Sequence, residues 1–407
     1  MLVPIVVAAA AVGGCGSADK PGSPVRGNTL TIYFSGPLHG ASSPGAVAAL
    51  RGAEMALADV HGRVGRYRIS FKALDDSTPQ SDGWDPNQTT ADARVAVQDP
   101  TTIGYLGEFN SGASAVAIPL VNRAGIAQIS PASTAVGLTS AGTGAAPGEP
   151  QKYYPTGDRT FARVVPTDAV QAVALVRVQQ AMGCRSVFVL HDGEVDGEDT
   201  ALTFVLTAQS AGLRVVGVQA FQRQAGNYAS LATGVAGSGA DCVLISAIDE
   251  RSSAVLTEQL ARALPDATIF ASNELADTAY TDPARGGIPS SLEPRVVVVS
   301  ATLDPAAYPV SGQAFLAAYS RQFGTPEPPA IFGYAAMSLM LGAISQATDG
   351  GRKPAIRSKV AAAIRSTPNV NSALGPFWID SAGDTTIDRY GIYRIVAGQL
   401  SFLEATG

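Results

Sequence analysis

Short strand-like runs alternate with longer helical patterns along most of this chain, and that alternation is the strongest constraint on its fold. It is typical of βαβ units, in which parallel strands form a sheet with helices on both faces. The series begins at Thr29 and starts again after Pro166. We therefore expect an α/β protein with two doubly wound parallel-sheet lobes. The expected strands are Thr29–Phe34, Tyr67–Leu74, Thr102–Leu106, Ala127–Ile129, Ser186–Leu190, Arg214–Val218, Val243–Ile248, Thr268–Ala271, Arg295–Ala301, Gly375–Ile379 and Arg389–Val396.

Apolar residues at helical spacing fill most of the intervals between these strands. One such segment, Phe332–Ala347, is predominantly apolar, but it is too short to span a bilayer and carries Ser338, Ser345 and Gln346, so we expect a core helix. The Gly- and Pro-rich segment Thr139–Pro155 is expected to be an exposed loop. The expected helices are Ala46–Val60, Ala91–Gln98, Ala113–Ala124, Ala169–Met182, Thr200–Ala211, Tyr228–Ala236, Ser252–Ala263, Gly312–Phe323, Phe332–Ala347 and Ala355–Ser366.

Chain length, composition and net charge limit the classes of protein to which this chain can belong. A chain of 407 residues is too long for one ordinary core, which favours two domains. Hydrophobic residues make up 46% and charged residues 15%, a composition typical of a folded chain. The net charge of −6 disfavours a nucleic-acid partner, because phosphates require clustered Lys and Arg.

The N-terminus predicts export. The apolar run Leu2–Val12 is too short to span a bilayer, and the small residues after it lead directly to Cys15. This pattern resembles the lipobox of bacterial lipoproteins, although no Lys or Arg precedes the apolar run. We expect residues 1–14 to be a signal peptide, Cys15 to carry the lipid anchor at the outer face of the cytoplasmic membrane, and residues 15–28 to form a flexible tether. The alternative is an ordinary cleaved signal peptide with an incidental Cys.

Two further cysteines, Cys184 and Cys242, each stand at the entry to an expected strand. If those strands are parallel neighbours, the two thiols meet at one end of the sheet. Export would place them in an oxidising compartment. A disulfide and a pair of buried free thiols both remain open at this point.

No catalytic or metal-binding motif stands out. The three histidines, His39, His61 and His191, are not paired with Cys or Ser in a nucleophile pattern, and no His/Cys cluster has zinc spacing. The chain also lacks a Walker-type phosphate loop. Asp192, Glu194 and Asp196 copy the first half of a calcium-binding EF-hand loop, but Thr203 replaces its final Glu. We expect no metal, no cofactor and no enzymatic activity.

Ser111 lies where ligands bind in open α/β sheets. A strand ends near Leu106 and a helix begins near Gly112, so Ser111 falls in a loop at the carboxyl end of a parallel strand. The unpaired N–H groups and positive dipole of the helix N-terminus favour an anionic ligand group there. An N-cap role explains a Ser at this position equally well.

The segments Thr102–Ser114 and Ile126–Thr134 resemble the branched-chain amino acid (leucine/isoleucine/valine) binding proteins of ABC transporters, within the type I periplasmic solute-binding proteins. The resemblance extends over nearly the whole chain from Asn28 to Leu403. Its supporting stretches are Gly36-Pro37, Asp75-Asp76, Val189–Asp192, Ile269–Glu274, Phe332–Ala336 and Gly375–Asp380.

The resemblance implies a ligand site. Ser111, Ala132 and Thr134 match the family residues that hold the carboxylate and ammonium of an amino acid, and Glu274 matches an acid that meets the ammonium. Asp168 matches a family Asp near the hinge, but it could equally cap the helix that begins at Ala169. Asn110 is a further candidate. So are Asp196 and Ile248, which stand near positions where the family often has aromatic residues, and this departure leaves the ligand's chemistry open.

The resemblance also implies a mechanism. The lobes would comprise residues 29–165 with 302–389, and 166–301 with 390–407, so that the chain crosses between them three times. Hinge closure would trap a small amino-acid-like solute and present it to an ABC permease, with the protein acting as a monomer. Two alternatives remain: a ligand sensor for a membrane receptor or kinase, and an enzyme acting on an amide or amino acid.

Overall fold

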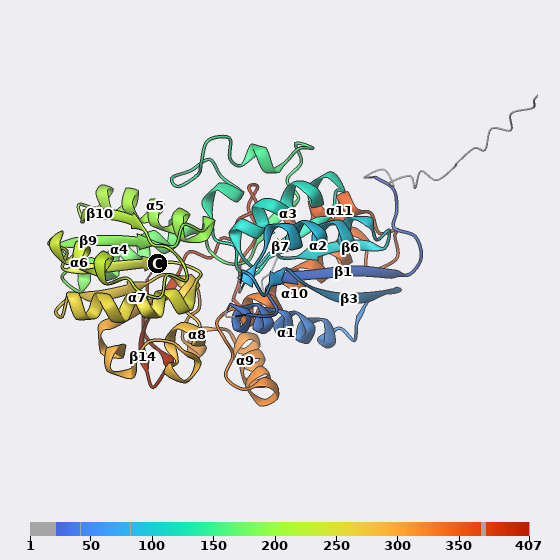
Figure 1. Ribbon diagram of the computed structural model, residues 1–407. Helices are drawn as coiled ribbons and strands as arrows, with labels where there is room; N and C mark the ends of the chain where they lie inside the picture. Colours follow the sequence, from blue (N-terminus) through green and yellow to red (C-terminus); the bar gives the residue numbers. More distant parts are fainter. Residues whose placement is uncertain (1–21, 41, 82, 368–371, 407) are drawn as a thin grey trace, which may run out of the picture.

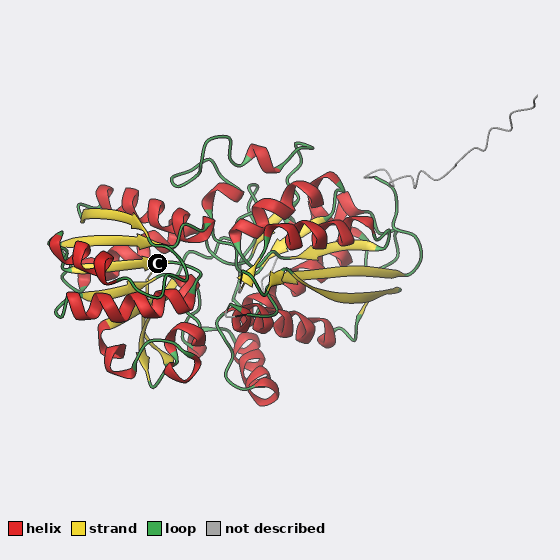
Figure 2. Ribbon diagram, in the orientation of Figure 1, coloured by secondary structure: helices red, strands yellow, loops and turns green. Residues whose placement is uncertain are grey.

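The computed structural model contains two α/β lobes that lie side by side (Figures 1 and 2). It describes residues 22–40, 42–81, 83–367 and 372–406. The expected signal peptide and Cys15 lie outside these residues, and the expected tether is described only from Gly22. Within the described part, the expected fold class is confirmed, because each lobe is built on its own sheet with helices on both faces.

The first sheet has six strands in the order β2-β3-β1-β6-β7-β8. All neighbours pair in parallel except β2, which is antiparallel to β3. The β8 strand was not expected from the sequence. The strands are β1 (Thr29–Gly36), β2 (Arg63–Val64), β3 (Tyr67–Asp75), β6 (Thr102–Leu106), β7 (Ala127–Ser130) and β8 (Phe161–Arg163).

Successive side chains of β1 pack on opposite faces of this sheet. Ile32 belongs to the core formed with α1, α10 and α11, whereas Tyr33 packs in the cluster formed with α2 and α3. Gly52 of α1 and Gly333 of α10 allow those helices to touch, because a Cβ at Gly333 would lie 1.9 Å from the carbonyl oxygen of Ala49. The helices are α1 (Ser43–Asp59), α2 (Pro86–Gln98), α3 (Ser111–Arg123), α10 (Pro329–Ala347) and α11 (Arg357–Ile364).

Helix α10 is the core helix that the sequence predicts. Among the described residues it alone is long and apolar enough to cross a membrane, but 67% of its most apolar window is buried inside the protein. Its contacts with α1 and α11 use that apolar surface. Burial against neighbouring helices therefore accounts for its composition.

The second sheet has seven strands in the order β10-β9-β11-β12-β13-β14-β15. Its first five strands are parallel, but β14 and β15 run antiparallel, so this sheet is mixed at one edge. The strands are β9 (Ser186–His191), β10 (Arg214–Ala220), β11 (Cys242–Ser246), β12 (Thr268–Ala271), β13 (Val296–Ser300), β14 (Tyr390–Val396) and β15 (Gln399–Thr406). Helices α4 (Asp168–Ala181) and α5 (Val195–Ser210) cover one face, and α6 (Ala229–Gly237) and α7 (Glu250–Ala263) cover the other.

Short elements fill the space between and around the lobes. Helices α8 (Thr278–Thr281) and α9 (Val310–Phe323) lie near the junction of the lobes in Figure 1. A small hairpin, β4 (Ser77–Thr78) and β5 (Gly83–Trp84), precedes α2. Six turns of 3₁₀ helix lie at Val136–Leu138, Gln151–Tyr153, Asn273–Leu275, Pro283–Arg285, Ser290–Arg295 and Pro305–Ala307.

The structure also differs from the sequence-based expectations in the following segments. The segment Gly375–Ile379 forms no strand: Phe377 and Ile379 make isolated bridges, and the partner of Ile379 is Thr385. The segment Thr139–Pro155 is anchored rather than fully exposed, because Tyr153 and Tyr154 are buried against α3. Helix α5 begins at Val195, five residues before the expected Thr200, because Asp196 and Glu198 suit the positive end of a helix and extend its first turn.

Cys184 and Cys242 are joined in a disulfide, with 5.8 Å between their Cα atoms. Cys184 lies just before β9 and Cys242 is the first residue of β11, and these two strands are parallel neighbours in the second sheet. Of the two alternatives that the sequence left open, the structure contains the disulfide.

Candidate functional site

A cavity of about 60 Å³ lies between the lobes, at the carboxyl ends of strands from both sheets. A buried water needs about 10–15 Å³, so the cavity has room for a compact solute. Five of the sequence-predicted residues line it: Asn110, Ala132, Asp196, Ile248 and Glu274. Three others, Ser111, Thr134 and Asp168, are fully buried and do not line the cavity.

Asp196 connects the two lobes at the N-terminus of α3. The backbone N–H of Ser111 donates to both carboxylate oxygens of Asp196, at 2.8 Å to Oδ1 and 3.1 Å to Oδ2. Asp196 reaches this position from the first turn of α5, not from a loop, which corrects the expected boundary of that helix. The place where a helix N-terminus favours an anion is therefore taken by a carboxylate of the opposite lobe.

The Ser111 side chain holds the turn that follows β7. Its Oγ accepts hydrogen bonds from the backbone N–H groups of Thr134, at 3.1 Å, and Ala135, at 3.2 Å. The N-cap of α3 is Asn110, and Ser111 is the first residue of the helix. Ser111 thus fixes the position of Thr134, while its N–H faces the second lobe.

Glu274 follows β12 and faces the same turn. Its Oε1 accepts from the hydroxyl of Thr134 at 3.3 Å and from the amide of Gln171 at 3.4 Å. Its Oε2 is buried and has no hydrogen-bond partner. Burial and the charge of Asp168 raise the pKa of Glu274 to about 7.

Asp168 lies behind the cavity, at the point where the chain enters the second lobe. It is the first residue of α4, its N–H donates to the carbonyl of Thr134 at 3.0 Å, and its Oδ1 accepts from Gln171 at 2.7 Å. Burial and the charge of Asp199 raise its pKa well above the usual range. Asp199, one helical turn after Asp196, accepts the N–H of Val136 at 2.9 Å, a second contact between α5 and the first lobe.

Two acids that the sequence analysis missed also line the cavity, Glu250 and Asp277. Glu250, the first residue of α7, accepts from the hydroxyl of Ser42 in the first lobe at 3.0 Å. Asp277 caps α8 by accepting the N–H of Ala279 at 2.7 Å. Burial and the charge of Asp277 raise the pKa of Glu250, and burial and the charge of Glu327 raise that of Asp277 to about 7. Their position just after β11 and β12 was the available signal, because ligands meet the carboxyl ends of such strands.

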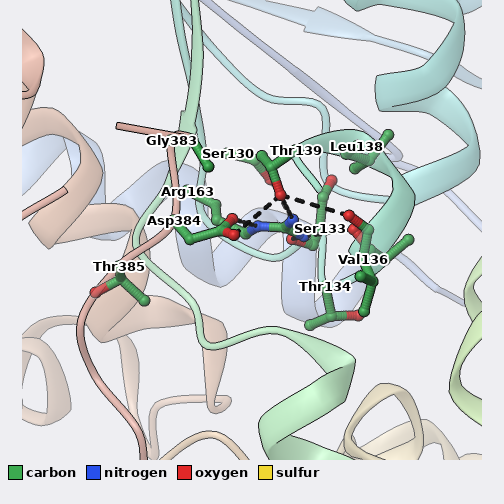
Figure 3. A network of polar contacts seen from close by, with 12 residues as sticks. Ser130, Ser133, Thr134, Val136, Leu138, Thr139, Arg163, Gly383, Asp384 and Thr385 are labelled. Carbon is green, nitrogen blue, oxygen red and sulfur yellow. Dashed lines mark hydrogen bonds and ion pairs between the residues drawn. The ribbon is translucent and has the colours of Figure 1, made fainter. Parts of the chain in front are cut away.

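A buried arginine supports the turn that carries Thr134 (Figure 3). The Arg163 side chain, fully buried at the end of β8, donates to Asp384 Oδ1 at 2.7 Å, and also to the carbonyls of Ser133 and Ala135 at 3.1 and 2.8 Å. A further hydrogen bond goes to the hydroxyl of Thr139. The geometry of this turn therefore depends on one charged side chain that does not line the cavity.

The carboxylates of the EF-hand-like segment do not converge on one point. Asp192 accepts backbone N–H groups of Glu194 and Ile248, Glu194 pairs with Arg223 at 2.5 Å, and Asp196 points to Ser111. No group of three or more potential metal ligands is found among the described residues.

Comparison with known proteins agrees with this architecture. A family model described as periplasmic binding protein matches residues 29–399. An "Amino acid binding protein" of Pseudomonas aeruginosa is 24% identical over 372 residues, which cover 90% of each chain. The leucine-binding protein LivK of Thermotoga maritima shares the fold with a TM-score of 0.78 at 20% identity, over 92% of this chain and 98% of that one.

Other solved structures with this fold contain different ligands. A solute-binding protein of a Rhodopseudomonas palustris ABC transporter, in complex with 4-hydroxybenzoate, has a TM-score of 0.75 at 16% identity, over 93% of this chain and 97% of that one. LivJ of Streptococcus pneumoniae, in complex with isoleucine, has a TM-score of 0.74 at 16% identity, over 93% and 98%. Because the family model matches most of its length, the chain belongs to the periplasmic binding protein family, with the type I fold.

Proposed function

We propose that this protein is an exported, lipid-anchored solute-binding protein that captures a small polar solute between its lobes and delivers it to an ABC permease. The observation that carries the proposal is the cavity at the lobe junction, which both lobes line with polar groups. Family membership supports export and solute binding. The described residues that line the cavity include no Cys, His or Lys that could act as a nucleophile or as its base, and we propose binding without turnover.

Hinge closure is the proposed mechanism. We place the lobe boundaries near residues 165, 301 and 389, because the chain passes from one sheet to the other after β8, after β13 and before β14. Contacts across the cleft support a closed form: Ser111 to Asp196, Val136 to Asp199, and Ser42 to Glu250. A solute that contacts both lobes would stabilise this form by its differential affinity for it.

The identity of the solute depends on this chain's own cavity. Relatives with the same fold are described with leucine, isoleucine or 4-hydroxybenzoate, so the fold alone is compatible with amino acids and with aromatic acids. A solute with an ammonium group, as in an amine or an amino-acid-like compound, agrees with the position of Glu274, whose partnerless oxygen Oε2 would accept that group.

Filling the cavity tests the proposed binding site. Ala132 lines the cavity, so an Ala132→Leu side chain would occupy space that the solute needs. In calorimetric titrations with a panel of amines, amino acids and benzoates, we expect every compound that binds the wild type to lose at least tenfold in affinity. Ala229→Leu, on the exposed surface of α6, is the matched control and should bind as the wild type does. Equal affinity of Ala132→Leu and the wild type would contradict the site.

The lipid anchor has a separate test. If Cys15 carries the lipid, Cys15→Ser should move the protein from the membrane fraction to the soluble fraction of the cell envelope, as measured by immunoblotting after fractionation. The disulfide uses the two other cysteines of the chain and should be unaffected. Continued membrane association of Cys15→Ser would rule out the anchor.

A further inference from the structure

All ionisable side chains that line the cavity are acidic. Asp196, Glu250, Glu274 and Asp277 line it, and its described lining includes no Lys, Arg or His. Arg285, which does not line the cavity, lowers the pKa of Asp277 through its charge. Carboxyl groups gathered in a buried site without a cation are costly, since each charged form lacks water and repels its neighbours.

Two buried polar atoms at the cavity have no hydrogen-bond partner, and both are acceptors. They are Oε2 of Glu274 and Oδ1 of Asn110, whose residue is 94% buried, with a relative exposure of 6%. Buried acceptors in folded proteins are normally satisfied. These two atoms therefore indicate a group with several N–H donors, which an ammonium or guanidinium group provides.

The place for an anion is already filled. A zwitterionic amino acid needs a group that receives its carboxylate, and the N-terminus of α3 would be the natural one. In this chain the N–H of Ser111 is engaged by both oxygens of Asp196. A ligand carboxylate would have to displace Asp196 and would then lie beside the acidic lining, where like charges repel.

We infer that the solute is a small organic cation without a free carboxylate, whose N–H groups are received by Glu274 and Asn110. This inference rests on the proposed function and specifies its ligand. Phe109, Phe332 and Ile248 line the same cavity and would contact the apolar part of the cation, with the aromatic faces adding cation–π attraction. The cavity volume of about 60 Å³ restricts the solute to a compact molecule.

Calorimetry of the purified full-length chain with three probes tests the inference. The probes are 1,4-diaminobutane as a cation, leucine as a zwitterion and 4-hydroxybenzoate as an anion. We expect 1,4-diaminobutane to bind at least tenfold more tightly than either of the other two. We expect Glu274→Gln to weaken that binding at least tenfold, because it removes the charge but keeps the shape. Glu54→Gln, an exposed change on α1, is the matched control and should leave binding unchanged.

The inference also predicts a gain of binding. Asp196→Ala exposes the N-terminus of α3, so the affinity for leucine should rise at least tenfold while that for 1,4-diaminobutane falls. Circular dichroism verifies that both variants fold, and the ranking of the three probes on the wild type does not depend on either variant. Tighter binding of leucine or 4-hydroxybenzoate by the wild type would overturn the inference but retain the proposed function. Binding of none of the three probes would overturn both.

Discussion

Replacing Arg163 with Met should lower the free energy of unfolding by about 3–5 kcal/mol, the usual cost of removing one partner from a buried ion pair. The Arg163 side chain is fully buried and its partner Asp384 is only 18% exposed. The substitution would also leave the carbonyls of Ser133 and Ala135 without their donor. The measurement is urea-induced unfolding, monitored by circular dichroism.

Arg185→Met provides the comparison. Arg185 pairs with Asp241 at 3.2 Å, but its side chain is 88% exposed. Exposed pairs of this kind contribute about 0–1 kcal/mol, so this variant should be nearly as stable as the wild type. Similar losses in the two variants would contradict the structural role that we assign to Arg163. Because Arg163 holds the turn that carries Thr134, its variant should also lose solute affinity at temperatures where it remains folded.

Raising the pH from 5 to 8 should destabilise the protein. The pKa of Asp196 is raised to about 6, chiefly by burial and also by the charges of Glu274 and Glu194, while the hydrogen bonds from Ser111 oppose the rise. A carboxyl with a raised pKa binds more protons in the folded than in the unfolded protein, so stability falls as the pH rises through that interval. Asp196 alone would contribute roughly 1.4 kcal/mol between these two pH values. Glu274 and Asp277, with pKa values of about 7, act in the same direction.

Asp196→Asn isolates one part of this effect. The Asn side chain keeps an oxygen that can accept the N–H of Ser111 but cannot titrate. In urea unfolding at pH 5 and pH 8, the difference in the free energy of unfolding should therefore be about 1.4 kcal/mol smaller than in the wild type. A wild type that becomes more stable toward pH 8, or a variant with an unchanged pH dependence, would contradict the account of the buried carboxyls. Saturating 1,4-diaminobutane should stabilise the wild type more at pH 8 than at pH 5, because the carboxyls must ionise to pair with it.

The order of strands and helices was largely predictable because each element carries its own local pattern. Strand β12 occupies Thr268–Ala271, the segment that its apolar run predicts. The elements that were missed depend on distant partners. Strand β8 has only three residues and is fixed by its pairing with β7, and β15 alternates between partly and fully exposed residues because it lies at the sheet edge. Conversely, Gly375–Ile379 has the composition of a strand, but among the described residues it forms only isolated bridges, one of which joins Ile379 to Thr385.

The position of the site in the fold was predictable from the sequence, but the contacts between its side chains were not. Loops after parallel strands were the expected location, and Asn110, Ala132, Asp196, Ile248 and Glu274 do line the cavity. No local pattern shows that Asp196 reaches the N–H of Ser111, because that contact joins residues 85 positions apart across the two lobes. This contact depends on where α5 begins. Because the helix begins at Val195, Asp196 and Asp199 lie one turn apart and both face the first lobe.

The central claim is that the two lobes close on a small cationic solute, and an inter-lobe distance measures this most directly. Spin labels at Gln80→Cys and Ala225→Cys, both exposed and on opposite lobes, would report the opening of the cleft in a Cys15→Ser background. Double electron–electron resonance should show a longer and broader distance distribution for the free protein, and a single shorter distance with 1,4-diaminobutane. The same distribution with and without the solute would contradict closure.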